Sequence, residues 1–214
     1  MTPSGFKTTT LAAGAATAIA AASRAAQTTP VDDFIGQIRS KDDSVRGPAW
    51  QGSAPWGAPA VKLLAVVMAD EDFEVARAAK RALWKIVRNA GRPGAAPEAR
   101  AVASELVALL AGKPAAIRRE LLWMLSEIGG DDAIGPMAKL LSDQDVREDA
   151  HCALMRLPSR KATAALKAAF AGAPEEFKFA LADSLRKRGE TVNGYPSQKL
   201  VPSRPTTVTQ PKPA

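Results

Sequence analysis

The sequence has very little of the chemistry that most enzymes and metal proteins use. Its single cysteine, Cys152, excludes an intramolecular disulfide, and its single histidine, His151, excludes a histidine-rich metal site. These two are neighbours, and successive residues of a helix point about 100° apart, so they cannot easily bind one metal ion together. The motifs HExxH, GxSxG, GxGxxG, CxxC and the P-loop are all absent. The sequence therefore predicts a protein that is not an enzyme and that needs no cofactor or metal.

Aromatic residues are also scarce, at 5% of the chain, and β-branched residues are sparse while alanine is abundant. This composition favours helix over strand. The 214 residues suffice for one domain with a sizeable core or for a short array of repeats.

Acidic residues are missing from both ends of the chain. Residues 1–26 and 191–214 hold five of the 29 basic residues and no acidic residue. The remaining 24 basic residues lie in 27–190 with all 22 acidic ones, so this middle segment has a net charge of only +2. The distribution argues against a nucleic-acid-binding surface that covers the whole domain.

The first segment, 1–26, has the pattern of a bacterial-type export signal. Lys7 precedes a short apolar run from Leu11 to Ala22, and 20–22 forms an A-x-A cleavage site. The run is too short to span a bilayer as a helix. We therefore expect an exported protein, in the periplasm or secreted. The alternative is a disordered Ala/Thr-rich leader on a cytoplasmic protein.

The last segment, 190–214, is rich in proline and lacks a periodic apolar pattern. This composition predicts a disordered, basic tail.

The middle of the chain repeats itself. Five segments align without gaps, namely SVRGPAWQGSAPWG, EVARAAKRALWKIV, AIRRELLWMLSEIG, DVREDAHCALMRLP and EFKFALADSLRKRG. Their second residues are Val45, Val75, Ile117, Val146 and Phe177. Apolar or small residues recur four, eight and eleven positions later, apart from Arg188 in the last segment, and these positions lie on one helical face. Gly or Pro follows at position twelve in four of the five. Five helices in register are thus predicted.

A second amphipathic segment precedes each of these helices, joined to it by a short acidic or Pro/Gly turn. Aspartate pairs at 32–33, 42–43 and 131–132 fall at predicted helix starts, where capping explains them. The unit is therefore a helix–turn–helix of about 30 residues. One long interval contains NAGRPGAAPEAR (89–100), an added loop or turn.

The turn and entry sequences SDQDVREDAHCAL (142–154), ADEDFEVARAAKRAL (69–83) and KDDSVRGPA (41–49) resemble HEAT repeats. They are most similar to the short HEAT-like repeats first described in phycobilisome lyases. The resemblance covers 31–189 and implies an all-α fold, a short right-handed α-solenoid of about five HEAT-like repeats. It specifies architecture rather than function, and no lyase catalytic residue can be carried over.

Both terminal repeats depart from the pattern, as the capping repeats of a solenoid do. Gly47 and Pro48 interrupt the first repeat, and Arg188 takes an apolar position in the last. Trp50 and Trp56 are expected to fill volume in the first repeat.

The second helix of each repeat usually lines the inner, concave face of such a solenoid. The register predicts that five polar-face residues of repeats two and three cluster there: Arg77, Arg81, Trp84, Arg119 and Trp123. Tryptophan and arginine together suit a binding hot spot. The alternative is that the tryptophans fold over neighbouring helices and the arginines are solvated.

This cluster predicts a protein–protein interaction module that binds an acidic or extended partner on its concave face. The alternative is nucleic-acid binding, in which the arginines contact phosphates and a tryptophan stacks on a base.

Overall fold

The fold is all-α, as predicted. The structure is a computed structural model, and it describes residues 29–197. The predicted leader at 1–26 lies outside the described residues. Within 29–197 the chain forms ten α-helices, two short 3₁₀-helices and no strand. The elements are α2 (Pro30–Ile38), α3 (Asp43–Gln51), η1 (Ala54–Trp56), α4 (Ala58–Val67), α5 (Phe73–Ala90), α6 (Ala96–Ala108), α7 (Ala115–Ile128), α8 (Asp131–Lys139), η2 (Leu140–Ser142), α9 (Arg147–Arg156), α10 (Arg160–Gly172) and α11 (Glu175–Lys187).

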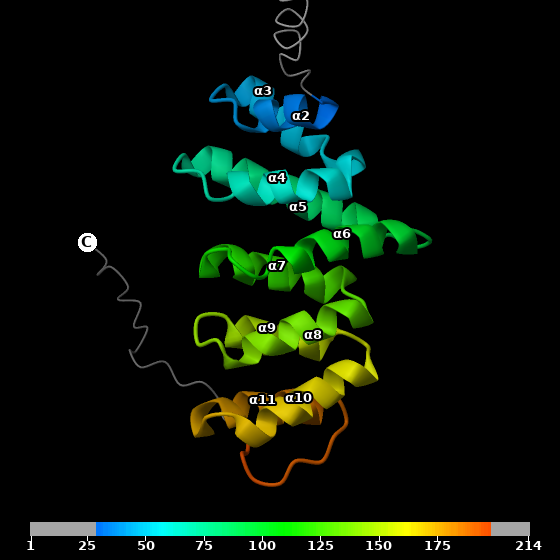
Figure 1. Cartoon of the computed structure of the whole chain (residues 1–214), viewed down its shortest axis with the longest axis vertical. Helices are drawn as coiled ribbons and strands as arrows, with labels where there is room; N and C mark the ends of the chain where they lie inside the picture. The colour runs from blue at the N-terminus through cyan, green and yellow to red at the C-terminus, as the bar shows by residue number, and fades with distance from the viewer. Residues whose placement is uncertain (1–28, 198–214) are drawn as a thin grey trace, which may run out of the picture.

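The helices form five pairs that stack as layers along the long axis of the molecule (Figure 1). The pairs are α2–α3, α4–α5, α6–α7, α8–α9 and α10–α11. Each pair packs mainly against the pair before it and the pair after it, so that α5 lies between α3 and α7 and α9 lies between α7 and α11. This arrangement is an α-solenoid of five helix–turn–helix repeats, and it confirms the predicted repeat number.

Aspartate side chains start several of these helices. The Asp42 carboxylate accepts a hydrogen bond from the backbone N–H of Ser44 at 2.9 Å, and Asp72 caps α5 in the same way through Glu74 N–H, also at 2.9 Å. Thr29 and Asp32 form a capping box at the start of α2. Hydrogen bonds from the Ser44 hydroxyl and backbone lower the pKa of Asp42. The aspartates at 32 and 42 are therefore capping residues.

The core follows the repeated positions. Counted from the second residue of each aligned segment (Val45 in the first), the residues four and eight places later are buried in all five repeats. The second residue itself is buried in four repeats, but in the first repeat Val45 is 41% exposed. Arg46 turns inward instead, because its guanidinium group closes the turn before α3 by donating to the Ser40 carbonyl at 2.7 Å and to Asp43 at 3.0 Å. The expectation of an apolar core residue at Val45 is thus wrong.

Helix ends also follow the pattern, with two exceptions. In repeat one, α3 already ends at Gln51, and the 3₁₀-helix η1 precedes the expected stop at Gly57. A Cβ atom at Gly129 would lie 2.4 Å from the Leu125 carbonyl oxygen, so only glycine fits where α7 ends. Gly189 ends α11 with φ +83°, in a Schellman motif. In repeat two the helix continues past Val87 to Ala90, and the insertion at 89–100 becomes extra helix plus the turn 91–95.

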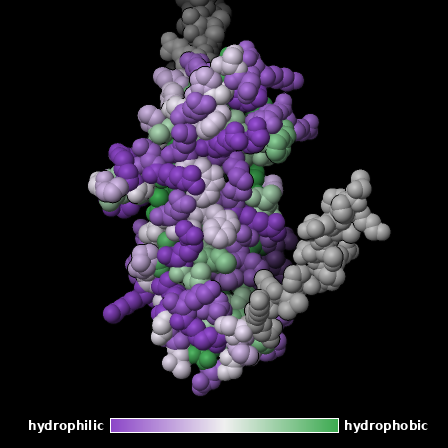
Figure 2. All heavy atoms as spheres, turned by 180° about the vertical axis from the view of Figure 1, so that it is seen from behind, coloured by the Kyte–Doolittle hydropathy of each residue, from purple (hydrophilic) through white to green (hydrophobic). Residues whose placement is uncertain are grey.

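The first repeat uses its tryptophans differently from one another. Trp56 is half-buried and stacks on Phe34, with ring centroids 4.8 Å apart. Trp50 is also half-buried, and it packs against the core from α3. Seen from behind, hydrophilic side chains cover most of the molecule and apolar ones form only small patches between them (Figure 2).

The last repeat is closed by residues beyond the predicted solenoid boundary. The Tyr195 ring packs edge-on against Phe170 and Phe179, at centroid distances of 5.4 and 5.2 Å. The Arg186 guanidinium donates to the Tyr195 carbonyl at 2.7 Å. The packed part of the chain therefore extends to at least Ser197, beyond the predicted end at 189. The remainder of the predicted tail, 198–214, lies outside the described residues.

Candidate functional site

Positive charge is concentrated on one of the five second helices. Helix α5 carries Arg77, Lys80, Arg81, Lys85 and Arg88 against one acidic residue, Glu74, for a net charge of +4. The other four second helices, α3, α7, α9 and α11, each hold equal numbers of acidic and basic residues. Any acidic ligand that approaches the second helices is therefore attracted to α5.

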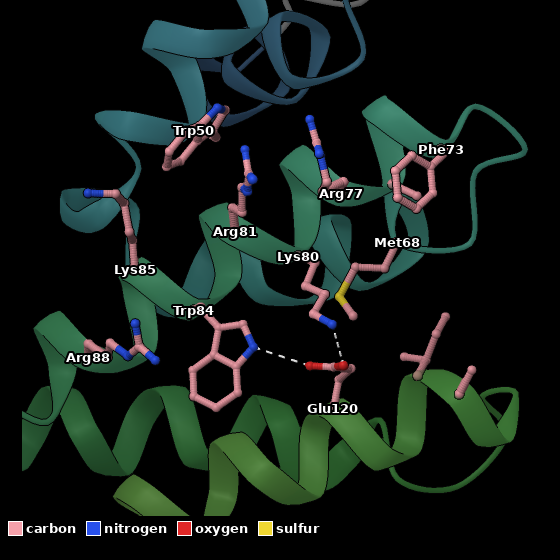
Figure 3. Close-up of a pocket in the computed structure, with 13 residues that line it drawn as sticks. Trp50, Met68, Phe73, Arg77, Lys80, Arg81, Trp84, Lys85, Arg88 and Glu120 are labelled. Carbon is pink, nitrogen blue, oxygen red and sulfur yellow. Dashed lines mark hydrogen bonds and ion pairs between the residues drawn. The ribbon is translucent and has the colours of Figure 1, made fainter. Parts of the chain in front are cut away.

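A groove of about 790 Å³ follows α5 between α3 and α7 (Figure 3). Trp50 of α3 stands on one side and Glu120 of α7 on the other, while Met68 and Phe73 lie at the N-terminal end of α5. The lining combines basic, aromatic and aliphatic side chains: Trp50, Met68, Phe73, Ala76, Arg77, Lys80, Arg81, Trp84, Lys85, Arg88, Ala116, Ile117 and Glu120.

Two of the five cations have no carboxylate partner among the described residues. These are Arg81 and Lys85, whose charged groups lie 5.1 and 5.8 Å from the centre of the Trp50 ring. By contrast, Arg77 pairs with Glu74, Lys80 pairs with Glu120, and Arg88 Nε lies 3.9 Å from the Glu127 carboxylate. Arg81 and Lys85 can therefore accept an incoming anion without breaking an existing ion pair.

The groove already holds one carboxylate of the chain itself. Glu120 accepts a hydrogen bond from Trp84 Nε1 at 3.2 Å and forms an ion pair with Lys80 (Figure 3). Arg88 lies over the ring of the same tryptophan, with its guanidinium carbon 5.0 Å from the centre of the Trp84 ring. The lining thus binds a carboxylate through one ammonium group and one indole N–H.

The structure brings together three of the five predicted site residues. Arg77, Arg81 and Trp84 line the groove, but Arg119 and Trp123 do not. Arg119 donates to the Asp145 carbonyl at 2.6 and 3.0 Å, and Trp123 Nε1 donates to Asp149 at 3.0 Å.

Two of the five predicted residues thus lie outside the groove lining. Arg119 and Trp123 of α7 contact the turn before α9 and α9 itself, just as Trp84 of α5 reaches Glu120 on α7. Helices α5, α7 and α9 thus each extend polar side chains to a carboxylate of the following repeat. Trp123 remains 37% exposed, and Arg156 lies 5.9 Å from its ring centre.

Sequence reasoning missed Trp50 as a groove residue and assigned it only to volume filling. It also left Lys85 and Arg88 out of the site. One signal could have found these two, because residues four and seven places after Arg81 share its helical face. Glu120 carried no such signal, since its contacts depend on how α7 docks on α5.

His151 is buried at the contact between α9 and α11. Its Nδ1 lies 3.1 Å from the Ser184 hydroxyl and its Nε2 lies 2.9 Å from the Glu148 carboxylate. Burial lowers the pKa of His151, although Glu148, Asp149 and Asp183 partly oppose this. Burial also raises the pKa of the neighbouring Cys152 thiol. Among the described residues, no three His, Cys, Asp or Glu side chains are grouped so that they could hold a metal ion.

This burial predicts a pH-dependent stability. Because the folded-state pKa of His151 is lowered, the unfolded chain binds a proton at higher pH, and the free energy of unfolding should fall as pH drops through about 6.5. His151→Gln should lose less stability than wild type between pH 7.5 and 5.5 in urea unfolding. Equal losses for both proteins would contradict the assignment, since the carboxylates with lowered pKa titrate below this range.

Comparisons with known proteins do not place the chain in a family. No family model matches the sequence, and no curated protein matches it. Similar solved structures include two engineered proteins of the Northeast Structural Genomics Consortium. One is 22% identical with a TM-score of 0.39, over 75% of this chain and 79% of its own. The other is 19% identical with a TM-score of 0.42, over 75% and 81%.

A third similar structure is a designed armadillo repeat protein in complex with the peptide (KR)4. It is 15% identical, with a TM-score of 0.37, over 74% of this chain and 99% of its own. Because all three TM-scores are low, the class rests on the five stacked helix pairs described above. By that geometry the chain is a helical-repeat α-solenoid. None of the helices between residues 29 and 197 has both the length and the apolar character that crossing a membrane requires.

Proposed function

We propose that this solenoid is a non-catalytic binding module that holds an acidic segment of another protein in the groove along α5. The observation that carries the proposal is the net charge of +4 on α5, including two cations beside Trp50 that have no carboxylate partner among the described residues. The repeats would be of the HEAT-like kind that the turn sequences resemble.

The chemistry of the lining favours binding over catalysis. Among the described residues, the groove lining includes no serine, threonine, cysteine or histidine, and its one carboxylate, Glu120, is held by Lys80 and Trp84. A nucleophile and a base within hydrogen-bond reach of each other are the usual minimum for covalent acyl transfer. The lining instead combines cations with apolar surface, as binding hot spots do.

The same groove fits a protein segment better than a nucleic acid. A strand of nucleic acid needs a continuous row of phosphate contacts, but the second helices on either side of α5 are electrically balanced. Cations also lie over the rings of Trp50 and Trp84, where bases would stack. Nucleic-acid binding remains the second candidate because of the five cations on α5.

A titration with two anionic probes separates these candidates. Trp50 and Trp84 line the groove, so intrinsic fluorescence reports binding directly. We expect a glutamate-rich peptide of ten residues to bind more tightly than a ten-nucleotide oligothymidylate at physiological salt. Tighter oligonucleotide binding, with a logarithmic salt slope of about −0.7 for each phosphate contacted, would instead support the nucleic-acid candidate.

We also propose that the protein is exported and meets its partner outside the cytoplasm, on the strength of the pattern at 1–26. The intact mass of the protein from its native cells tests this. A chain that keeps Met1 or Thr2 and remains in the cytoplasm would contradict export.

A further inference from the structure

The two ends of the groove along α5 differ in chemistry. At the N-terminal end of α5, Phe73 is 71% exposed and lies near Met68, and Ala116 and Ile117 add apolar lining from α7. The cation nearest to this end, Arg77, is already paired with Glu74. The other end carries Arg81 and Lys85, which have no carboxylate partner among the described residues, and Arg88, which has one long ion pair, 3.9 Å from Glu127. The groove is therefore apolar at one end and cationic at the other.

Phe73 is unusual for its exposure. It is the first residue of α5, and Arg77 lies 5.6 Å from the centre of its ring. A large aromatic side chain that stays exposed beside other apolar lining gains free energy when a ligand covers it. This end of the groove therefore suits an apolar side chain of the ligand.

The length of the groove suits a short extended segment. Phe73 and Arg88 are fifteen residues apart on one helix, which corresponds to about 22 Å along its axis. An extended chain advances about 3.3 Å per residue. Roughly seven residues would therefore run from the apolar end to the cationic end.

The cations are spaced like alternate side chains of such a segment. Arg81, Lys85 and Arg88 lie on successive turns, separated along the axis by about 6 and 4.5 Å. In an extended chain, side chains on the same side are about 6.7 Å apart. Long arginine and lysine side chains accommodate the small difference, so carboxylates at alternate positions can each meet one cation.

From this polarity we propose that the groove recognises an extended segment of a partner protein with an apolar anchor at the Phe73 end and acidic residues at alternate positions toward Arg88. The inference rests on the proposed function and names its ligand. Anchor and charges act together, because the anchor fixes the register in which the carboxylates meet the cations.

Seven-residue peptides test the inference on the whole protein. The first peptide has one terminal leucine and three glutamates at alternate positions. It is made in two versions, with leucine at the N-terminus or at the C-terminus, so that both directions of the peptide along α5 are tested. One control peptide replaces leucine with serine, and another places the three glutamates side by side. The protein variants are Phe73→Ser and Val66→Ser, which removes a 48% exposed apolar side chain of α4 outside the groove.

We expect leucine, in one of its two positions, to tighten binding at least tenfold over serine. Phe73→Ser should remove this gain, while Val66→Ser should keep it. Equal affinities of the leucine and serine peptides, or a gain that survives Phe73→Ser, would overturn the inference and leave the charge-based function intact. Equal affinity of the side-by-side glutamate peptide would also overturn it. If no acidic peptide binds wild type, or an oligonucleotide of similar length binds more tightly, both the inference and the proposed function fail.

Discussion

Replacing Arg188 with leucine should lower the free energy of unfolding by about 3 kcal/mol, even though leucine matches the repeat pattern better. The Arg188 side chain leaves α11 and reaches the end of α9. Its guanidinium group donates to the carbonyls of Met155 and Leu157 at 2.7 Å each and to Ser159 at 2.6 Å, and its Nε donates to the Thr163 hydroxyl at 2.8 Å. Leucine would remove all of these hydrogen bonds from part-buried acceptors, and the Leu157 and Ser159 carbonyls would keep only their backbone N–H partners.

Chemical denaturation of matched variants checks this expectation. Lys187→Leu also replaces a cation with leucine, one residue earlier, and loses only an exposed ion pair with Asp183. It should therefore lower the free energy of unfolding by less than about 0.5 kcal/mol. Arg188→Lys keeps the charge but not the planar group that bridges several carbonyls, so it should recover only part of the loss. An Arg188→Leu protein as stable as wild type would show that the apolar pattern, and not the hydrogen bonds, governs this position.

Reversing the charges of Arg81 and Lys85, the two cations beside Trp50, should have the largest effect on peptide affinity. In Arg81→Glu/Lys85→Glu, two attractive charges become two repulsive ones at the cationic end of the groove. We expect the affinity for a glutamate-rich peptide to fall about a hundredfold, equivalent to about 2.7 kcal/mol. Both side chains are exposed and lack ion pairs with described residues, so the fold should be retained.

The matched control reverses two exposed cations on first helices, Lys62 of α4 and Arg100 of α6. Lys62→Glu/Arg100→Glu changes the net charge by the same amount but should reduce the affinity less than about fivefold, since these positions lie outside the groove and the effect is screened by salt. Equal losses in both double variants would mean that overall charge, and not the groove, attracts the peptide. Thermal unfolding of both variants confirms that they are folded.

The periodicity of the sequence was sufficient to predict five repeats and most of the core. Leu83, Leu125 and Leu154 all fall at one aligned position and are fully buried, because a local helical face determines which side chains turn inward. The local pattern failed at Val45. The neighbouring Arg46 side chain turns inward there instead, because its guanidinium group donates to the Ser40 carbonyl in the turn before α3.

The site was less predictable than the core, for a physical reason. The register correctly placed Arg77, Arg81 and Trp84 on one face, but it could not say which neighbouring repeat each long side chain would contact. The indoles of Trp84 and Trp123 each donate to a carboxylate of the next repeat, but Glu120 lines the groove and Asp149 does not. Such contacts depend on the docking of successive helix pairs, which one-dimensional spacing does not contain.

The position of Trp50 links ligand binding to the docking of the first repeat. Trp50 belongs to α3, whose only buried residues are Arg46 and Ala49, whereas α5 buries eight residues. In a linear array, the terminal repeat with the fewest buried contacts opens first. A ligand that touches both Trp50 and α5 therefore has to hold that repeat in place. The measured affinity of such a ligand therefore includes the free energy of docking the first repeat onto α5. Saturating ligand should protect the backbone amides of α3 from hydrogen exchange more than those of α9.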